Sequence, residues 1–102
     1  MDIFVDIDDT ICKTKGLDYK IAVPLWANIQ KINELYDKGH NITYWTARGV
    51  KTKIDHRELT EFQLEAWGCK YHKLKLTKEP FDLLIDDKCI NSSEFFNEDI
   101  EY

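Results

Sequence analysis

The stretch MDIFVDIDDTIC, residues 1–12, constrains the fold of this chain more than any other. Residues 3–5 are apolar and rich in β-forming types, which predicts a strand buried on both faces, as in a parallel sheet. Asp6, Asp8 and Asp9 follow this strand directly. Neighbouring carboxylates repel one another, and a divalent cation that prefers oxygen ligands, such as Mg²⁺, would keep them ionised. The stretch alone does not distinguish a metal site from an acidic turn that ends a strand in solvent.

Length and composition limit the class of protein. The 102 residues, 43% of them hydrophobic, suffice for one globular domain with a single core, so residues 1–102 are interpreted as one domain. The net charge of −5 argues against broad affinity for nucleic acid, which needs a basic surface. No apolar run approaches membrane-spanning length, and strand-like residues begin too close to Met1 for a signal peptide. Three cysteines without a CxxC pair favour reduced thiols, so we expect a cytoplasmic protein without a membrane partner.

The hydrophobic periodicity predicts alternating strands and helices. Pro24 suits the first residue of a helix, and Gly39 suits the residue after its end. Asp55 and Glu58 resemble a capping box at the start of a second helix. The expected elements, in chain order, are strand 3–5, a polar connection 12–20, helix 24–38, strand 41–46, helix 55–68, strand 71–76, strand 81–87 and one helical turn around 95–96.

This alternation indicates right-handed βαβ units, and hence an α/β, three-layer Rossmann-like fold with a small parallel sheet. We expect the strand order 4-1-2-3, in which strand 81–87 lies beside strand 3–5. In such sheets the ligand site lies beyond the carboxyl ends of the strands. Asp6, Thr46 and Asp86 all fall at those ends, so three strands each deliver an oxygen-bearing side chain to one edge.

These residue types are suited to phosphoryl transfer. Asp6 and Asp86 could share a metal ion, with Asp87 as a further ligand, and Asp8 would reach the same pocket. Asp6 would attack a phosphate ester, while Asp8 protonates the leaving oxygen and later takes a proton from water. Thr46 offers a hydroxyl to a phosphate oxygen. A lysine is needed to offset the phosphate charge, and the candidates are Lys73, Lys75, Lys78 and Lys88.

The same motifs resemble those of the haloacid dehalogenase (HAD) superfamily of phosphohydrolases. Its signature is an apolar strand followed by DxDx[TV], a strand ending in Thr or Ser, a lysine, and an apolar strand ending in acidic residues. Here these motifs occur in that order as FVDIDDT, ITYWT, TKEP and LLIDD. The resemblance covers residues 1–90 and implies a single HAD-like catalytic domain.

The resemblance also implies a role for each matching residue. It implies Asp6 as nucleophile and Asp8 as the acid–base group. It implies Thr46 and Lys78 as phosphate ligands, with Lys75 as the alternative lysine. The implied cofactor is Mg²⁺, bound by Asp6, the main-chain carbonyl of Asp8, and Asp86, with Asp87 as a further ligand.

A narrower resemblance suggests the substrate. The stretch WTARG, the helix end EAWG and the ending IDDK are similar to those of small bacterial capsule-biosynthesis phosphatases, which implies a phosphosugar substrate. The intervals between motifs are too short for a cap domain, so we expect an open site. Specificity is then left to loop residues, to a neighbour in a homo-oligomer or to a large substrate. Arg48 could contact substrate phosphate or a sugar hydroxyl, or it could be an ordinary surface arginine.

The sequence argues to different degrees against three other interpretations of these motifs. A response-regulator receiver domain would carry its phospho-acceptor aspartate after the third strand, and residues 71–76 end in none. A catalytically silent HAD domain is at odds with the intact Asp6 and Asp8. A nucleotide or polynucleotide-end substrate keeps the same chemistry, and the acidic net charge disfavours only long nucleic acid.

Overall fold

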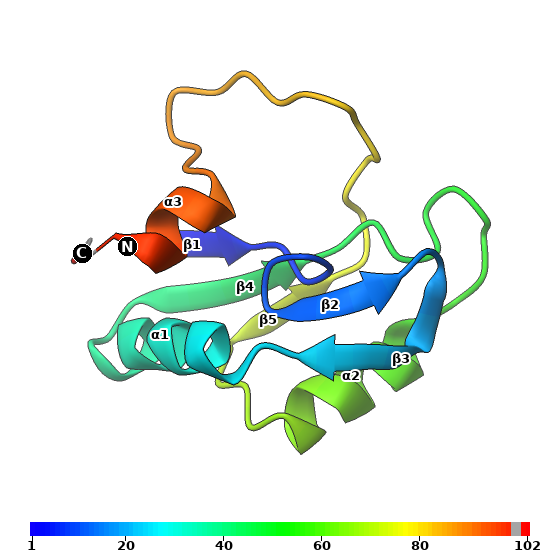
Figure 1. Ribbon diagram of the computed structural model, residues 1–102, viewed down its shortest axis with the longest axis horizontal. Coiled ribbons are helices and arrows are strands. Elements are labelled where there is room, and N and C mark those ends of the chain that lie inside the picture. Colours follow the sequence, from blue (N-terminus) through cyan, green and yellow to red (C-terminus); the bar gives the residue numbers. More distant parts are fainter. Residues whose placement is uncertain (99–100) are drawn as a thin grey trace.

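The structure, a computed structural model, describes residues 1–98 and 101–102. Helices and strands alternate over most of this length (Figure 1). The elements are β1 (Asp2–Val5), β2 (Cys12–Lys15), β3 (Asp18–Pro24), α1 (Trp26–Asp37), β4 (Asn41–Trp45), α2 (Arg57–Ala66), β5 (Lys73–Lys75) and α3 (Ser92–Asn97).

Three parallel strands form the central sheet, in the order β1-β4-β5. Asp2 pairs with Asn41 at one end of the sheet, and Val5 pairs with Tyr44 at the other. The buried residues of β4 and the apolar stripe of α1 meet in the core, because both are apolar on the faces that they turn to each other. The predicted α/β class with a small parallel sheet is confirmed.

The predicted order of four strands, 4-1-2-3, is wrong. Within the described residues the sheet has three strands, and residues 81–87 form no strand. Instead, residues 79–91, here called the arch, leave the body of the molecule and return at α3 (Figure 1). Every residue of the arch is exposed.

Chain length explains why the arch does not pair with β1 of its own sheet as predicted. The Lys78 amide donates to the Thr46 carbonyl, 3.1 Å away, which fixes the chain at the carboxyl end of β4. A parallel strand beside β1 must begin level with Asp2, about 16 Å back along the strands and about 10 Å across two strand spacings. The four residues 79–82 span at most about 14 Å. The predicted strand therefore cannot reach its place from Lys78.

The predicted polar connection after the acidic turn is instead an antiparallel hairpin, β2–β3, in which Cys12 pairs with Pro24. Gly16 turns the chain with φ of +60°, a conformation that glycine adopts without strain. Pro24 ends β3 and does not begin a helix. A proline fits there because it occupies the last position of a strand in a two-stranded sheet, where few backbone N–H groups are needed.

Helix α1 follows the predicted periodicity, whereas in α2 the apolar Phe62 is 69% exposed. Ile29, Ile32 and Leu35 of α1 are buried, as the stripe predicted. Helix α2 begins at Arg57, and Asp55 accepts a hydrogen bond from the Arg57 amide, not from the predicted capping-box position. The turn predicted around residues 95–96 is α3. Among the described residues, no helix is both long and apolar enough to span a membrane.

Candidate active site

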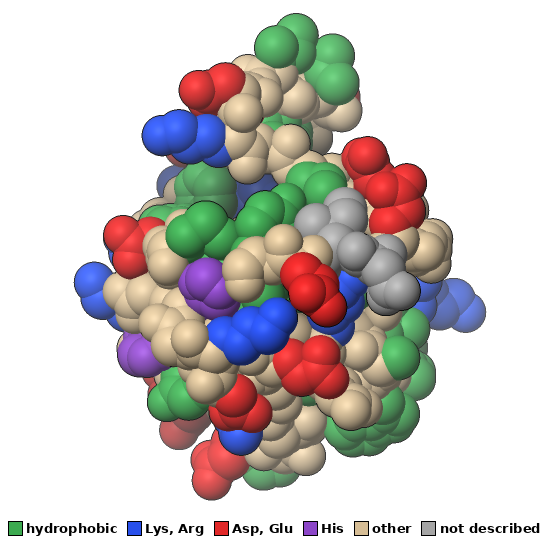
Figure 2. All heavy atoms as spheres, turned by 90° about the vertical axis from the view of Figure 1, so that its left-hand side faces the viewer, with side chains coloured by type: hydrophobic (Ala, Val, Ile, Leu, Met, Phe, Trp, Pro, Cys, Tyr) green, Lys and Arg blue, Asp and Glu red, His purple; other side chains and the backbone are tan. Residues whose placement is uncertain are grey.

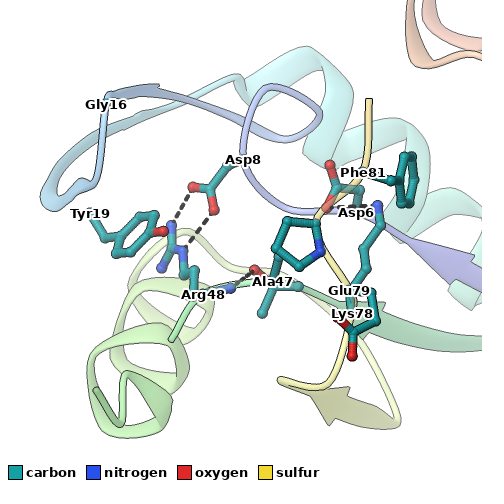
Figure 3. A pocket seen from close by; sticks show the side chains of 11 residues that line it. Asp6, Asp8, Gly16, Tyr19, Ala47, Arg48, Lys78, Glu79 and Phe81 are labelled. Atoms are coloured by element: carbon teal, nitrogen blue, oxygen red, sulfur yellow. Dashed lines mark hydrogen bonds and ion pairs between the residues drawn. The ribbon is translucent and has the colours of Figure 1, made fainter. Parts of the chain in front are cut away.

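The turn after β1 is held by two isoleucines. Ile7 and Ile11 are fully buried, and the Ile11 amide donates to the Ile7 carbonyl over 2.9 Å. Because Ile7 points into the core, its neighbours Asp6 and Asp8 are directed the other way, toward a pocket (Figure 3). Anchoring by alternate apolar residues thus presents two carboxylates at the carboxyl end of β1.

The pocket has a volume of about 310 Å³ and lies beyond the ends of β1 and β4. It brings together five of the seven predicted site residues: Asp6, Asp8, Thr46, Arg48 and Lys78. It does not include Asp86 or Asp87, which lie in the arch. The remaining lining residues are Gly16, Tyr19, Ala47, Glu79, Pro80 and Phe81.

Asp6 is paired with the pocket lysine. Lys78 Nζ lies 3.3 Å from Asp6 Oδ1, and the Thr10 hydroxyl donates to Asp6 Oδ2 over 3.3 Å. Burial raises the pKa of Asp6 above its ordinary value, and the Lys78 ammonium only partly opposes this shift. The Asp6 carboxylate therefore faces the pocket, and the Lys78 ammonium is its cationic partner there.

Asp8 is held far more tightly, by a bidentate pair with Arg48. Arg48 Nε donates to Asp8 Oδ2 over 3.0 Å and Nη2 donates to Oδ1 over 2.8 Å, and the Thr14 hydroxyl donates to the same Oδ1. Burial alone would raise the pKa of Asp8, but the hydrogen bonds from Arg48 and Thr14 outweigh it and lower the pKa. Asp8 is thus ionised and fixed in one orientation.

Arg48 is fully buried, so it is not the surface arginine weighed as an alternative. Its Nη1 donates to the Thr60 hydroxyl over 3.1 Å and to Gln63 Oε1 over 2.6 Å, and its guanidinium lies 4.7 Å from the centre of the Tyr19 ring. Each of the three guanidinium nitrogens of Arg48 therefore donates to a protein group. In this structure Arg48 positions Asp8.

Thr46 and the turn after it complete the floor of the pocket. The Thr46 side chain is buried, and its Oγ1 accepts a hydrogen bond from the Arg48 amide over 3.2 Å. Gly49 has φ of +80°, and a Cβ there would lie 2.0 Å from the Ile54 carbonyl oxygen. Only glycine fits this position, which lets the loop fold back and bring Arg48 under Asp8.

The lysine that lies in the pocket is Lys78, and Lys75 does not line it. Lys78 Nζ lies 5.6 Å from the centre of the Trp45 ring and 5.3 Å from that of Phe81, so two aromatic side chains flank it. Lys75 Nζ instead lies 5.6 Å from the centre of the Phe4 ring.

Sequence reasoning missed the residues that hold Arg48, namely Thr14, Tyr19, Thr60 and Gln63. Their residue types and spacing gave no signal in the sequence. Thr60 and Gln63 are polar residues one helical turn apart in α2, and only the structure shows that both are buried. Buried polar groups are nearly always hydrogen-bonded, and here Arg48 is their partner.

The magnesium ligands predicted from the motifs are not gathered in a single chain. Asp8 uses both carboxylate oxygens for Arg48, and Asp86 is exposed in the arch, where its Oδ1 accepts from the Lys88 amide. Among the described residues, no group of three His, Cys, Asp or Glu side chains is placed to hold a metal ion. One copy of the described chain therefore brings Asp6 and Asp8 into the pocket but leaves Asp86 and Asp87 outside it.

Comparison with known proteins identifies one similar structure. A crystal structure of a structural-genomics target from Vibrio cholerae superposes with a TM-score of 0.85, at 23% identity, over 98% of this chain and 91% of that one. At this level of identity the likeness establishes the fold alone. No family model and no curated protein sequence matches this chain.

Proposed function

We propose that this chain hydrolyses phosphate monoesters through an aspartyl-phosphate on Asp6, within a HAD-like domain of the three-layer Rossmann type. The main support is that Lys78, 3.3 Å from Asp6, shares one pocket with Asp8 and Thr46 at the carboxyl ends of β1 and β4. A carboxylate beside a fixed cation and a hydroxyl provides a nucleophile together with ligands for a phosphate group.

The proposed reaction has two steps. In the first, an oxygen of Asp6 attacks phosphorus, the bond from phosphorus to the ester oxygen breaks, and Asp8 gives a proton to the leaving oxygen. In the second, water attacks the aspartyl-phosphate, Asp8 takes its proton, and inorganic phosphate leaves the regenerated Asp6 carboxylate. Lys78 offsets charge on the transferring group, and the Thr46 hydroxyl donates to one of its oxygens.

The pair with Arg48 keeps Asp8 deprotonated in the free protein, because it holds the pKa of Asp8 below its ordinary value. The proton for the first step must therefore reach Asp8 when substrate binds. A phosphate monoester can bring it as the monoanion, the form that prevails below about pH 6, and the negative charge of the bound phosphate raises the proton affinity of Asp8 so that it can accept this proton. Arg48 then keeps the carboxylate aimed at the position of the leaving oxygen.

A small phosphosugar of polysaccharide biosynthesis, in the cytoplasm, is the proposed substrate. A pocket of about 310 Å³ is at the small end of ligand sites. Gly16 and Tyr19 of the β2–β3 hairpin line it, so the hairpin forms a wall beside Asp8. Mg²⁺ remains part of the proposal, and bound beside Asp6 it would supply further positive charge against the transferring phosphoryl group.

The test is phosphate release from a panel of sugar phosphates, mononucleotides and phosphorylated oligonucleotides, with and without Mg²⁺. We expect Asp6→Asn to abolish turnover, by about 10³-fold or more, because an amide is not a nucleophile for phosphorus. Asp9→Asn is the matched control: Asp9 is exposed, and its φ of +62° suits asparagine. Asp6→Asn with the turnover of the wild type would remove Asp6 as nucleophile.

A further inference from the structure

Residues 82–86 of the arch repeat the pattern of β1. Asp82-Leu-Leu-Ile-Asp86 matches Asp2-Ile-Phe-Val-Asp6 in the positions of both acidic residues and of the three apolar residues between them. Yet Leu83, Leu84 and Ile85 have exposed fractions of 75%, 45% and 88%. Figure 2 shows hydrophobic side chains at the outer end of the lobe that stands clear of the body. A strand-forming segment is thus exposed to solvent.

The edge of β1 that faces away from β4 has no strand beside it in the described part of the chain. An open edge presents unpaired backbone N–H and C=O groups and is a template for a further strand. Phe4 on this strand is 52% exposed. The molecule therefore contains both an unpaired strand segment and an unpaired edge, and the short tether from Lys78 prevents them from meeting in parallel within one chain.

The direction of the arch indicates how they could meet. The arch leaves from Lys78 at the carboxyl end of the sheet and ends at α3 near the start of β1, so it runs opposite to its own β1 (Figure 1). The tail after α3 confirms this placement, because the Tyr102 carbonyl lies 3.1 Å from His40, just before β4. In a two-fold dimer with the β1 edges facing each other, the sheets are antiparallel, and each arch runs parallel to the β1 of the other copy.

We propose that two copies of this chain exchange their arches, with residues 82–86 of each pairing in parallel with the β1 edge of the other. In step with the repeated pattern, Ile85 then lies beside the partner's Val5 and Asp86 beside the partner's Asp6. The exchange needs no chain reversal and no crossing of the sheet, because Lys78 and α3 keep their places. The two three-stranded sheets become one continuous sheet with both β1 edges covered.

The exchange completes the pocket in trans. Asp86 joins Asp6 and the Asp8 main chain of the other copy and adds to that pocket an oxygen ligand from the arch. Two carboxylates brought this close repel one another unless a cation lies between them, so Mg²⁺ should tighten the dimer. Only this assignment of Asp86 to the pocket rests on the proposed function. The pairing itself rests on the edge, the pattern and the chain direction.

Assembly is measured first, by sedimentation velocity on the full chain. We expect a species of twice the 12.1 kDa chain mass, with a lower dissociation constant in Mg²⁺ than in chelator. Ile85→Asp should be monomeric, since it places a charge in the new sheet while the single chain leaves that residue exposed. Leu17→Asp, at a residue 70% exposed in the hairpin, is the control and should stay dimeric. A wild-type chain that is monomeric in Mg²⁺ at every concentration overturns the proposal.

A disulfide tests the register. In a Cys89→Ser background, Phe4→Cys and Leu84→Cys should form a disulfide between copies on oxidation, because neighbouring strands place these Cα atoms about 4.8 Å apart. The product on a non-reducing gel should be a covalent dimer. A disulfide within one chain, which leaves the monomer mass, overturns the exchange.

Complementation separates this proposal from the proposed function. Mixing Asp6→Asn with Asp86→Asn copies should restore one working pocket in each mixed dimer, whereas either variant alone is inactive. An active wild-type protein whose variants do not complement overturns the exchange but leaves the hydrolase intact. A wild-type dimer that releases no phosphate from any substrate overturns the hydrolase but leaves the exchange intact.

Discussion

Residues 2–6 and residues 82–86 carry the same sequence pattern and have opposite surroundings. The first segment is a paired strand, with Val5 6% exposed. The second is unpaired, with Ile85 88% exposed. Both are strand-forming by residue type, so propensity does not account for the difference. What differs is whether a strand edge lies within reach of the segment. Strand β1 pairs with β4, whereas the arch starts at the carboxyl end of the sheet and cannot reach the position for parallel pairing with β1 of its own chain.

The contrast extends to the acidic residue that ends each segment. Burial raises the pKa of Asp6, whereas a backbone hydrogen bond from Lys88 lowers the pKa of the exposed Asp86. Two aspartates at equivalent positions of the same sequence pattern therefore have pKa values shifted in opposite directions, because one is buried and the other is exposed. If the arches are exchanged, Asp86 moves from solvent to the neighbourhood of Asp6, and the two environments become alike.

The largest expected effect comes from placing one charge in each segment. Val5→Asp buries an unpaired carboxylate in the core and should lower the free energy of unfolding by ~3–5 kcal/mol, a large part of the stability of a small domain. Ile85→Asp should change it by less than ~0.5 kcal/mol, because that side chain is exposed in the single chain. Urea unfolding at protein concentrations low enough to keep the chain monomeric measures both. Equal destabilisation by the two variants would show that residues 82–86 are packed in the monomer.

A second prediction compares Arg48, which is buried beside the pocket, with Arg57, which is exposed at the surface. Arg48→Lys keeps the charge but loses the bidentate pair with Asp8 and the bonds to Thr60 and Gln63, and it should destabilise the fold by ~1–3 kcal/mol. Arg57→Lys, in an exposed pair with Glu61, should change stability by at most ~0.5 kcal/mol. Thermal or urea unfolding of both variants provides the measurement.

The same pair of variants should separate in turnover. Arg48→Lys releases Asp8 from its fixed orientation, so kcat should fall more than KM rises, and Arg57→Lys should behave as wild type. An Arg48→Lys protein with full stability and full turnover would mean that Asp8 is oriented by the turn after β1 alone, without help from Arg48.

Sequence reasoning predicted the features that are local. The core strands, the apolar face of α1 and the positions of Asp6 and Thr46 at strand ends follow from short patterns, because alternation and helical spacing reflect burial directly. The hairpin was missed because its turn depends on Gly16, whose positive φ is not visible among polar neighbours. Residues 81–87 do have the local pattern of a strand. The predicted strand does not form because the chain from Lys78 is too short to place it beside β1, and this distance depends on the whole fold.

The pair of Asp8 and Arg48 could not be predicted for a related reason. The two residues are 40 positions apart, and neither stretch alone shows that the arginine turns inward. Its burial follows from Gly49, which allows the tight loop, and from the polar face of α2, which supplies partners. The sequence prediction for Arg48 as a substrate ligand therefore did not include its pair with Asp8.

The last prediction compares the reactivity of two thiols, one in each region, in the wild-type protein. Cys12 follows the turn after β1 and is fully buried, and burial raises its pKa to about 11. Cys89 is exposed in the arch. A shift from an ordinary value near 9 to about 11 leaves about a hundredfold less thiolate at pH 8, where the thiolate is the reactive form. Alkylation followed by peptide mass mapping should therefore label Cys89 at least a hundredfold faster, and the two rates should converge in denaturant. Similar rates in the folded protein would mean that the turn carrying Asp6 and Asp8 opens as readily as the arch, and the distinction between an anchored half of the pocket and an exposed one would be lost.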